Sequence, residues 1–514
     1  MWAQDRTGRV RARSRTGAAS LEQGHDFKSP GLEWKSVTEN RRRADGERTR
    51  AAAERRPDTD PARPTAAAVV PEDVDDLVTL TDGVDTGIVL LWWKDGTCRR
   101  LTFAFDVSSV PSGVERDGHP TVDVRAVDDD PPVARPLPFA SVEAVRPVSR
   151  AETVTEALPA DHARRAATLR GLADHAPHLV DVTVVLCLLE ASDDDGARLD
   201  ALRCLSTLAD ARPDDCVAAI PRVHDLVVDP PDSIVHAGAL TCLASLAAAL
   251  PAEVAPHVRS VFSALDAADD AAVTAGVTCI SHVASTDAEA VVYAADRLVD
   301  LVTAAEPTVR LHAAYALGRI AVVAPEAIRP AVADLTGVVG DETERTATRL
   351  NATCAVGRVA GEWPDVVVDP LPTFVDALDA DDAGIRANAA GVVGDVATTQ
   401  AVAVKRHVAP LFACLDDADD VTRANASTAL ARVAREFPEA VTDHVDRLVD
   451  ALEDDHPLVR ENACWTLGYL RDEARHARPV LERVRTDDGD ERVRGRAAWA
   501  LDEVGDGSSV GATD

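Results

Sequence analysis

Apolar and small residues recur along this chain in a pattern that repeats about every 37 residues. In each repeat a position taken as zero, usually basic, is followed by apolar or small residues at +3, +7, +10 and +11. This spacing is typical of one buried stripe on a helix. The zero positions are His162, Arg198, His236, Val273, Arg310, Arg349, Arg386, Arg423, Arg460 and Arg494. A fixed period of this length predicts a solenoid of about ten two-helix units.

Proline and aspartate divide each unit. Proline stands at +15 in six units, namely Pro177, Pro213, Pro251, Pro325, Pro364 and Pro438. Because proline suits the first turn of a helix and cannot continue the helix before it, it predicts two helices per unit. The second stretch, such as residues 441–452, is again amphipathic and ends in an acidic turn. Asp417, Asp454 and Asp488 lie six residues before the next arginine, where we expect them to cap the following helix and pair with its arginine.

Position +8 is a glycine or alanine in five units: Gly318, Gly357, Gly394, Ala431 and Gly468. A glycine inside a helix costs roughly 1 kcal/mol relative to alanine. Close approach of another helix is the physical reason we expect for accepting that cost.

The paired helices, the acidic turn and the Val-Arg-x-x-Ala opening, as in Val309-Arg310-Leu311-His312-Ala313, resemble the HEAT repeat family. The resemblance is strongest to its short lyase-type HEAT-like repeats and covers residues 161–507. It implies an all-α superhelical solenoid. It also implies a scaffold, transport receptor or assembly factor more often than an enzyme.

A different pattern, typical of strands, precedes the repeats. Residues 87–93 are an apolar run after a glycine, apolar residues alternate over residues 100–105, and residues 121–127 and 141–145 are expected to be further strands. The Asp95-Gly96 pair between the first two runs is a strong signal for a hairpin. We therefore expect a small antiparallel β domain within residues 67–150.

Residues 1–66 carry a net charge of +5, so the remaining residues carry −38. With arginine runs and few periodic apolar residues, this segment reads as a disordered basic tail. The alternative is that it is a non-native extension and that translation starts near Val69 or Val70. We also expect residues 508–514 to be a disordered tail.

The whole chain has a formal charge of −33, and aromatic residues make up only 4% of it. Such an acidic, lysine-poor composition resembles that of proteins from extreme halophiles. The charge repels nucleic acid and anionic lipid, and concentrated salt further weakens phosphate binding. No apolar run reaches the ~18 residues that a membrane helix needs. We therefore expect a cytoplasmic protein with no nucleic-acid or membrane partner.

Positions +2, +5 and +9 of the first helix share a face that differs from the buried stripe. In HEAT arrays the corresponding helices usually line the concave surface, so these positions predict a strip that binds a protein segment. Its candidate residues are His312, Tyr315, Arg319, Asn351, Arg358, Asn388, Asn425, Arg432, Asn462, Trp465, Tyr469, Arg496 and Trp499. Amide, guanidinium and aromatic groups are suited to holding peptides. The alternative is that the asparagines bond to neighbouring turns and the arginines pair with aspartates. If the strip binds, changing Arg319, Arg358 and Arg432 together should weaken capture without unfolding the array.

Enzymatic chemistry has little support in the sequence. No phosphate loop, Gly-x-Ser-x-Gly or His-Glu-x-x-His motif occurs, and no histidine is followed by glutamate as in the iron-binding HEAT hydroxylases. The closest cysteines are Cys204 and Cys216, which favours buried, reduced thiols over a metal site. We therefore predict a non-catalytic scaffold without cofactor or metal. The alternative is a lyase-type accessory factor for attaching a cofactor or chromophore, which bound pigment or iron in the purified protein would reveal.

Overall fold

A computed structural model of the chain describes residues 78, 88–95, 98–109, 121–128, 134–148, 151–191 and 193–505. The predictions made for residues 1–66 and 508–514 lie outside these residues. The described part contains a small β-sheet followed by a long array of helices, which agrees with the predicted fold class.

The sheet is antiparallel and has five strands in the order β4-β3-β2-β1-β5. The strands are β1 (Val89–Asp95), β2 (Cys98–Ser109), β3 (Thr121–Ala126), β4 (Arg135–Pro138) and β5 (Val142–Pro147). Asp95 pairs with Cys98, which confirms the hairpin predicted at Asp95-Gly96. Strand β4 was not predicted, because two of its four residues are prolines; it lies at the edge of the sheet, where a missing N–H is tolerated.

One face of this sheet shares a core with the first helices of the array. Ile88 and Phe103 belong to the same apolar cluster as residues of α4 (His162–His175) and of the short helix α3 (Ala151–Ala157). A Cβ added at Gly171 of α4 would lie 1.6 Å from the carbonyl oxygen of Val127. Only glycine therefore permits this close approach between the helix and the sheet.

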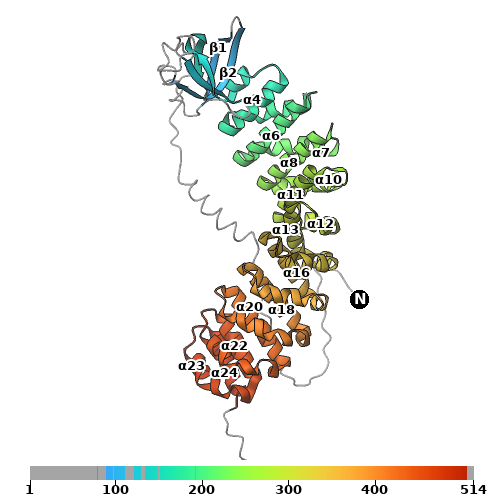
Figure 1. The fold of residues 1–514 in the computed structure, drawn as a ribbon, viewed down its shortest axis with the longest axis vertical. Helices are drawn as coiled ribbons and strands as arrows, with labels where there is room; N and C mark the ends of the chain where they lie inside the picture. Colours follow the sequence, from blue (N-terminus) through green and yellow to red (C-terminus); the bar gives the residue numbers. More distant parts are fainter. Residues whose placement is uncertain are drawn as a thin grey trace, which may run out of the picture. The chain divides into compact units, whose positions relative to one another are not determined.

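Ten long helices form one layer of the array, and consecutive members of this layer contact one another (Figure 1). They are α4, α6 (Asp195–Ala211), α8 (Ser233–Ala249), α11 (Asp270–Thr286), α13 (Pro307–Val323), α16 (Thr346–Glu362), α18 (Ala383–Val404), α20 (Asp420–Glu436), α22 (Pro457–Leu470) and α24 (Glu491–Glu503). The predicted number of units is therefore confirmed. Helix α18 is kinked at Gln400, which has non-helical dihedrals.

The second layer consists of shorter helices. They are α5 (Val182–Ala191), α7 (Ile220–Val228), α10 (Val258–Ala264), α12 (Ala295–Val302), α15 (Val332–Gly340), α17 (Leu371–Asp376), α19 (Val408–Ala413), α21 (Val445–Asp450) and α23 (Arg478–Asp487). The helix expected at residues 441–452 is divided into η13 (Thr442–His444), α21 and η14 (Ala451–Glu453). Its apolar residues still keep helical spacing, since Val441, Val445, Leu448 and Leu452 are all buried.

The six prolines at +15 each begin the short segment that follows a long helix, as predicted. These segments are η2 (Pro177–Leu179), η3 (Pro213–Ala219), α9 (Pro251–Val254), α14 (Pro325–Ile328), η8 (Pro364–Val367) and η12 (Pro438–Ala440). The remaining 3-10 turns are η1 (Phe139–Ser141), η4 (Ala255–His257), η5 (Leu265–Ala267), η6 (Glu289–Ala294), η7 (Arg329–Ala331), η9 (Ala377–Asp379), η10 (Lys405–His407), η11 (Cys414–Asp416) and η15 (Arg471–Ala477).

The predicted stripe at +3, +7, +10 and +11 forms the core between the layers. In the unit of Arg423, for example, Ala426, Leu430, Val433 and Ala434 are all fully buried. The +8 glycines have a weaker role than expected. A Cβ at Gly468 would lie 2.4 Å from the Trp499 ring, but at Gly318 the nearest atom is 3.4 Å away, which is an ordinary contact.

Candidate functional site

The predicted strip divides into buried and partly exposed residues. Six of its members are buried, namely Asn351, Asn388, Asn425, Arg432, Asn462 and Trp465. The other seven are partly exposed, namely His312, Tyr315, Arg319, Arg358, Tyr469, Arg496 and Trp499. The strip is therefore not a uniformly accessible surface, and its buried members act first on the packing of the array.

The buried asparagines bond to the preceding unit. Asn425 Nδ2 donates to the Ala387 carbonyl at 2.8 Å, and Asn462 Nδ2 donates to the hydroxyls of Ser427 and Thr428 at 3.1 and 2.9 Å. Both asparagines are about 1% exposed. Because a buried amide needs partners, these bonds tie consecutive long helices together, as the alternative interpretation of the strip expects.

Arg432 is also a link between units. Its side chain is 3% exposed, and its Nη1 donates to the Gly394 carbonyl at 2.7 Å and to Asp395 Oδ1 at 3.2 Å. Burial raises the pKa of Asp395 to about 6, against the lowering effect of Arg432, and burial also lowers the pKa of Arg432. Removing Arg432 would leave a buried carboxylate without its partner. Its substitution is therefore expected to destabilise the array, contrary to the expectation from sequence.

Nearer the middle of the array the strip is more accessible. His312 Nδ1 lies 2.7 Å from Ser281 Oγ. Arg319 donates to the carbonyls of Ala284 and Ser285 at 3.4 and 3.3 Å, which are long bonds. Arg319 and Arg358 are both partly exposed. Their guanidinium groups thus differ from that of Arg432 in their access to solvent.

The last two units bring four strip residues into one aromatic cluster, which consists of Trp465, Tyr469, Arg496 and Trp499. The Trp465 and Trp499 ring centroids are 4.6 Å apart, and those of Tyr469 and Trp499 are 5.4 Å apart. The Arg496 guanidinium lies 3.2 Å from the Trp465 ring centroid, within the range of a cation–π contact. Gly468 provides the space that Trp499 occupies.

The arginines at position zero form a ladder along the turns between units, which the sequence analysis did not foresee. Arg386 binds Asp417 of the next unit through Nε at 2.5 Å and Nη2 at 2.9 Å. Its Nη1 donates to the carbonyls of Ala380 and Asp381 in its own turn at 2.7 and 2.9 Å. Equivalent bidentate contacts join Arg423 to Asp454 and Arg460 to Asp488. Each contact is called a rung below.

The predicted roles of Asp417, Asp454 and Asp488 are therefore partly wrong. Each carboxylate pairs with the arginine of the preceding unit, and only its main-chain carbonyl accepts from the following arginine, as from Arg423 Nη1 at 2.8 Å for Asp417. The helix cap is the residue two positions later, which is Asp419, His456 or Asp490. Asp419, for example, accepts from the Thr422 N–H at 2.9 Å. The carboxylates of Asp417, Asp454 and Asp488 do not cap the following helix and are thus available to pair with an arginine of another turn.

The rungs change the pKa values of both partners. Burial alone would raise the pKa of Asp417, but hydrogen bonds from Arg386 and from the Asp419 N–H hold it below its usual value. The hydrogen bond from Arg460 likewise lowers the pKa of Asp488. The Asp417 hydrogen bond raises the pKa of Arg386. Both charges are therefore favoured in a rung, in contrast to the buried Arg432–Asp395 pair.

The ladder is not continuous. The residues 31 positions after Val273 and Arg349 are Ala304 and Ala380, so neither position has the carboxylate of a rung. The third unit lacks both partners. His236 replaces the arginine, and the residue equivalent to Asp417, 31 positions later, is Ala267. The sequence analysis noted the missing arginines at 236 and 273 but had no signal for the missing carboxylate, since the pairing itself was unknown. Arg198 in the preceding unit bonds to Asp195 at the start of its own helix, at 2.6 Å, and to no carboxylate of another turn in the described part of the chain.

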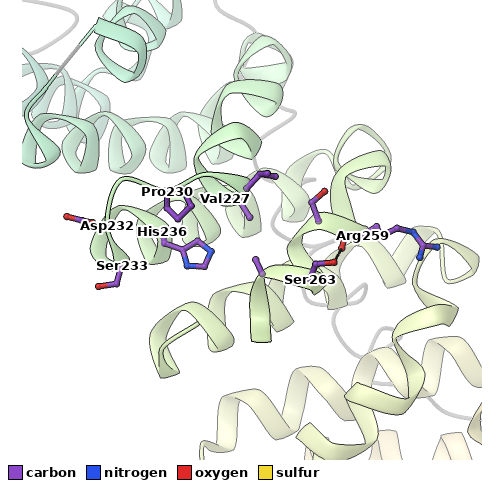
Figure 2. Close-up of a pocket in the computed structure, with 10 residues that line it drawn as sticks. Val227, Pro230, Asp232, Ser233, His236, Arg259 and Ser263 are labelled. Atoms are coloured by element: carbon purple, nitrogen blue, oxygen red, sulfur yellow. Dashed lines mark hydrogen bonds between the residues drawn. The ribbon is translucent and has the colours of Figure 1, made fainter. Parts of the chain in front are cut away.

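A crevice of about 800 Å³ lies at this interruption (Figure 2). Val227, Pro230, Asp232 and Ser233 line it around His236. Across from them lie side chains of α10, the second-layer helix of the same unit, namely Arg259, Ser260, Ser263 and Ala264. His236 is 8% exposed, and among the described residues its Nε2 has no hydrogen-bond partner.

Most of the thiols are buried. Burial raises the pKa of Cys242, Cys279 and Cys414 to about 12. Such thiols stay protonated near neutral pH and are poor nucleophiles. Cys187 is exposed, so the expectation of uniformly buried thiols is wrong there. In the described part of the chain, no three His, Cys, Asp or Glu side chains are grouped as a metal site, and no helix is long and apolar enough to cross a bilayer.

Residues 408–502 match the family model for HEAT repeats. No curated protein matches the chain. Among solved structures, the chain is similar to an engineered protein with a TM-score of 0.61 and 23% identity, over 69% of this chain and 98% of that one. It is also similar to a structure from work on a phosphorylation switch that controls the interaction between cadherin and beta-catenin. That match has a TM-score of 0.56 and 15% identity, over 69% of this chain and 85% of that one.

These matches support a helical repeat solenoid. At such low identities the structural matches show the fold alone. The family match covers the region that contains the Arg423 and Arg460 rungs and the aromatic cluster.

Proposed function

We propose that this chain is a non-catalytic scaffold that binds a segment of a partner protein on the face formed by its long helices. This is the face that the sequence analysis expects to be concave. The partly exposed members of the strip would make the contacts. The buried asparagines and Arg432 would hold the helices in register beneath them.

The observation that carries the proposal is the aromatic cluster. Trp465, Tyr469 and Trp499 lie within 5.7 Å of one another by ring centroids, and Arg496 stacks on Trp465. Tryptophan, tyrosine and arginine dominate the binding energy of protein interfaces, because they offer large and rigid contact area. Tyr469, Arg496 and Trp499 are partly exposed, so a partner can reach them.

Arg319 and Arg358 would extend this contact toward the middle of the array. Both lie on the same face of their helices as the cluster, at position +9 of their units. Arginine recognises carboxylates through paired hydrogen bonds, which suits a partner segment with acidic side chains.

Affinity capture with the full chain as bait would test the proposal. The double variant Tyr469→Ser/Arg496→Ser removes two accessible groups of the cluster and leaves Trp499 packed on Gly468. The matched control Arg475→Ser/Arg483→Ser changes two exposed residues in the other layer. We expect the cluster variant to lose proteins that the wild type and the control both capture. Identical captured sets for all three, with unchanged circular dichroism, would contradict the proposal.

A second variant tests the middle of the face. Arg319→Gln/Arg358→Gln leaves the buried Arg432 intact, and an unchanged circular dichroism melt would show that weakened capture is not a consequence of unfolding. We expect weaker capture than for the wild type. Full capture by this variant would confine the binding surface to the aromatic cluster.

We further propose that the protein works in concentrated salt, as its composition suggests. With a charge of −33, self-repulsion opposes folding in dilute buffer, and salt screens it. Urea unfolding in dilute buffer and in molar KCl would test this. Higher stability in KCl is expected, and equal or lower stability would contradict it.

A further inference from the structure

The crevice beside His236 belongs to a series that recurs between units. The equivalent crevice at the Arg386 rung measures about 830 Å³. That at Arg310, which pairs with Glu344 through Nε, measures about 520 Å³. Their lining positions correspond: Pro230 stands where Ala380 stands in the Arg386 unit, and Ser263 stands where Ala413 stands. The intact rungs therefore show what such a crevice normally contains.

An intact crevice contains a guanidinium group. Arg386 uses Nη1 to bond two carbonyls of its own turn and uses Nε and Nη2 to bond Asp417. The geometry satisfies several acceptors with one planar, multi-donor cation. The same arrangement recurs at Arg423 and Arg460.

The crevice at His236 lacks this cation. The imidazole is shorter than an arginine side chain, and no hydrogen bond joins it to the carbonyls of Pro230 or Pro231 among those of the described residues. Its Nε2 is buried without a partner there, which costs about 1–3 kcal/mol if it remains so. In the tautomer with the proton on Nδ1, Nε2 is an unused, buried acceptor.

The remaining polar groups also favour a cation. Asp232 lines the crevice with a carboxylate whose Oδ1 accepts from the Val235 N–H at 2.7 Å, which leaves Oδ2 for a cation. Ser233 and Ser263 add hydroxyls, and that of Ser263 donates to the Arg259 carbonyl at 3.1 Å. Arg259 lines the far wall, but its Cζ lies 4.0 Å from the Tyr293 ring centroid, and Figure 2 shows its guanidinium pointing away from His236. The chain as a whole is strongly acidic, with a charge of −33.

We propose that this crevice binds the side chain of an arginine from a partner protein, in the place that the chain's own arginine takes at an intact rung. The site is separate from the aromatic cluster and does not depend on it. A partner that carried both an arginine and a segment for the long helices would contact two surfaces at once.

Binding of N-acetyl-arginine amide to the full chain, measured by saturation-transfer NMR titration, tests the proposal. The analogue N-acetyl-citrulline amide has the same shape without the charge, and N-acetyl-aspartate amide tests the opposite charge. The variant His236→Arg/Ala267→Asp rebuilds the rung and fills the crevice. The control Thr241→Arg/Ala271→Asp makes the same charge change at exposed positions of α8 and α11.

We expect the arginine amide to bind the wild type and the control, and to bind the rebuilt variant about tenfold more weakly or not at all. The citrulline amide should bind none of the three proteins. Circular dichroism melting would establish that each variant folds. If the double variant does not fold, the single variant His236→Arg would be used to fill the crevice instead. Equal binding of the arginine amide to wild type and rebuilt protein, no binding to any form, or preference for the aspartate amide would overturn the proposal.

Discussion

Two regions of the array share one apolar core but differ in the polar contacts between their units. From α18 to α24, every junction has an arginine rung to the next unit, and buried asparagines link the long helices. Around α8 and α11, the rung is missing, and the positions equivalent to the asparagines are Gly238 and Ala275. The buried stripe is therefore enough to build a unit, whereas polar contacts vary from one junction to the next.

This difference matters because a solenoid unit contacts only its neighbours. Its stability is approximately a sum of the terms within units and the terms between adjacent units. A junction without a rung is expected to open more readily than one with a rung. Junctions without a rung are thus the positions where polar groups of the array can bind a partner.

Breaking a rung should have the largest effect on stability. Arg423→Ala would leave Asp454 without its cation, with only the His456 N–H as a donor, and would remove a donor from two turn carbonyls. The side chains of Arg423 and Asp454 are only 15% and 12% exposed. We expect a loss of about 3 kcal/mol in the free energy of unfolding. Arg198→Ala, beside the interruption, should cost about 1 kcal/mol or less, because Arg198 pairs only with a partly exposed Asp195. Urea unfolding of both variants would measure the difference. Equal losses would contradict the claim that a rung stabilises its junction more than the Arg198 contact does.

Removing an asparagine link should have a smaller effect. Asn462→Ala deletes two hydrogen bonds and leaves the buried hydroxyls of Ser427 and Thr428 with fewer partners. A loss of about 1–2 kcal/mol is expected by urea unfolding. Thr241→Ala, on the exposed side of α8, is the control and should change stability little. If Asn462→Ala were equally harmless, the asparagines would not contribute to the link.

Rebuilding the missing rung should stabilise the protein. His236→Arg/Ala267→Asp would place a bidentate pair where neither partner now exists, and we expect a gain of about 1 kcal/mol. Thermal melting relative to each single variant would show whether the gain requires both changes. A gain from either change alone would indicate general charge effects instead of a rung.

The two kinds of arginine–carboxylate pair should respond to pH in opposite directions. The lowered pKa values of Asp417 and Asp488 mean that their contribution to stability is complete above the unfolded value of 3.8 and is lost as pH falls through the folded values. Asp395 has a raised pKa of about 6, so its contribution falls as pH rises from about 4 to about 6. Asp395→Asn should therefore flatten the pH dependence of stability in that window. An unchanged curve would contradict the raised pKa.

The sequence predicted the repeat, its buried stripe and the prolines that separate its helices, because these depend on local spacing. Ala426 and Leu430 are apolar at helical intervals. Pro438 ends a helix because its ring removes the N–H and clashes with the preceding turn. The hairpin at Asp95 is likewise a local signal. Strand β4 lacked such a signal, since its prolines resemble a loop.

Contacts across units could not be read in this way. The pairing of Arg386 with Asp417 depends on how far one unit is displaced against the next, which no local pattern encodes. For the same reason the strip was predicted to be accessible along its whole length, although six of its residues are buried. Position +2 of α20 faces the preceding helix, so Asn425 is buried, whereas Tyr469 at +9 of α22 is partly exposed. The cap at Asp419 did have a signal, an aspartate immediately before the helix, which the analysis assigned to the wrong aspartate.

Hydrogen–deuterium exchange on the full chain tests the contrast between these two regions most directly. We predict that amides in the first turn of α8, at the interruption, exchange faster than those in the first turns of α20 and α22, beside intact rungs. Adding N-acetyl-arginine amide should slow exchange at α8 alone. Equal exchange at all three turns, unaffected by the ligand, would contradict the account.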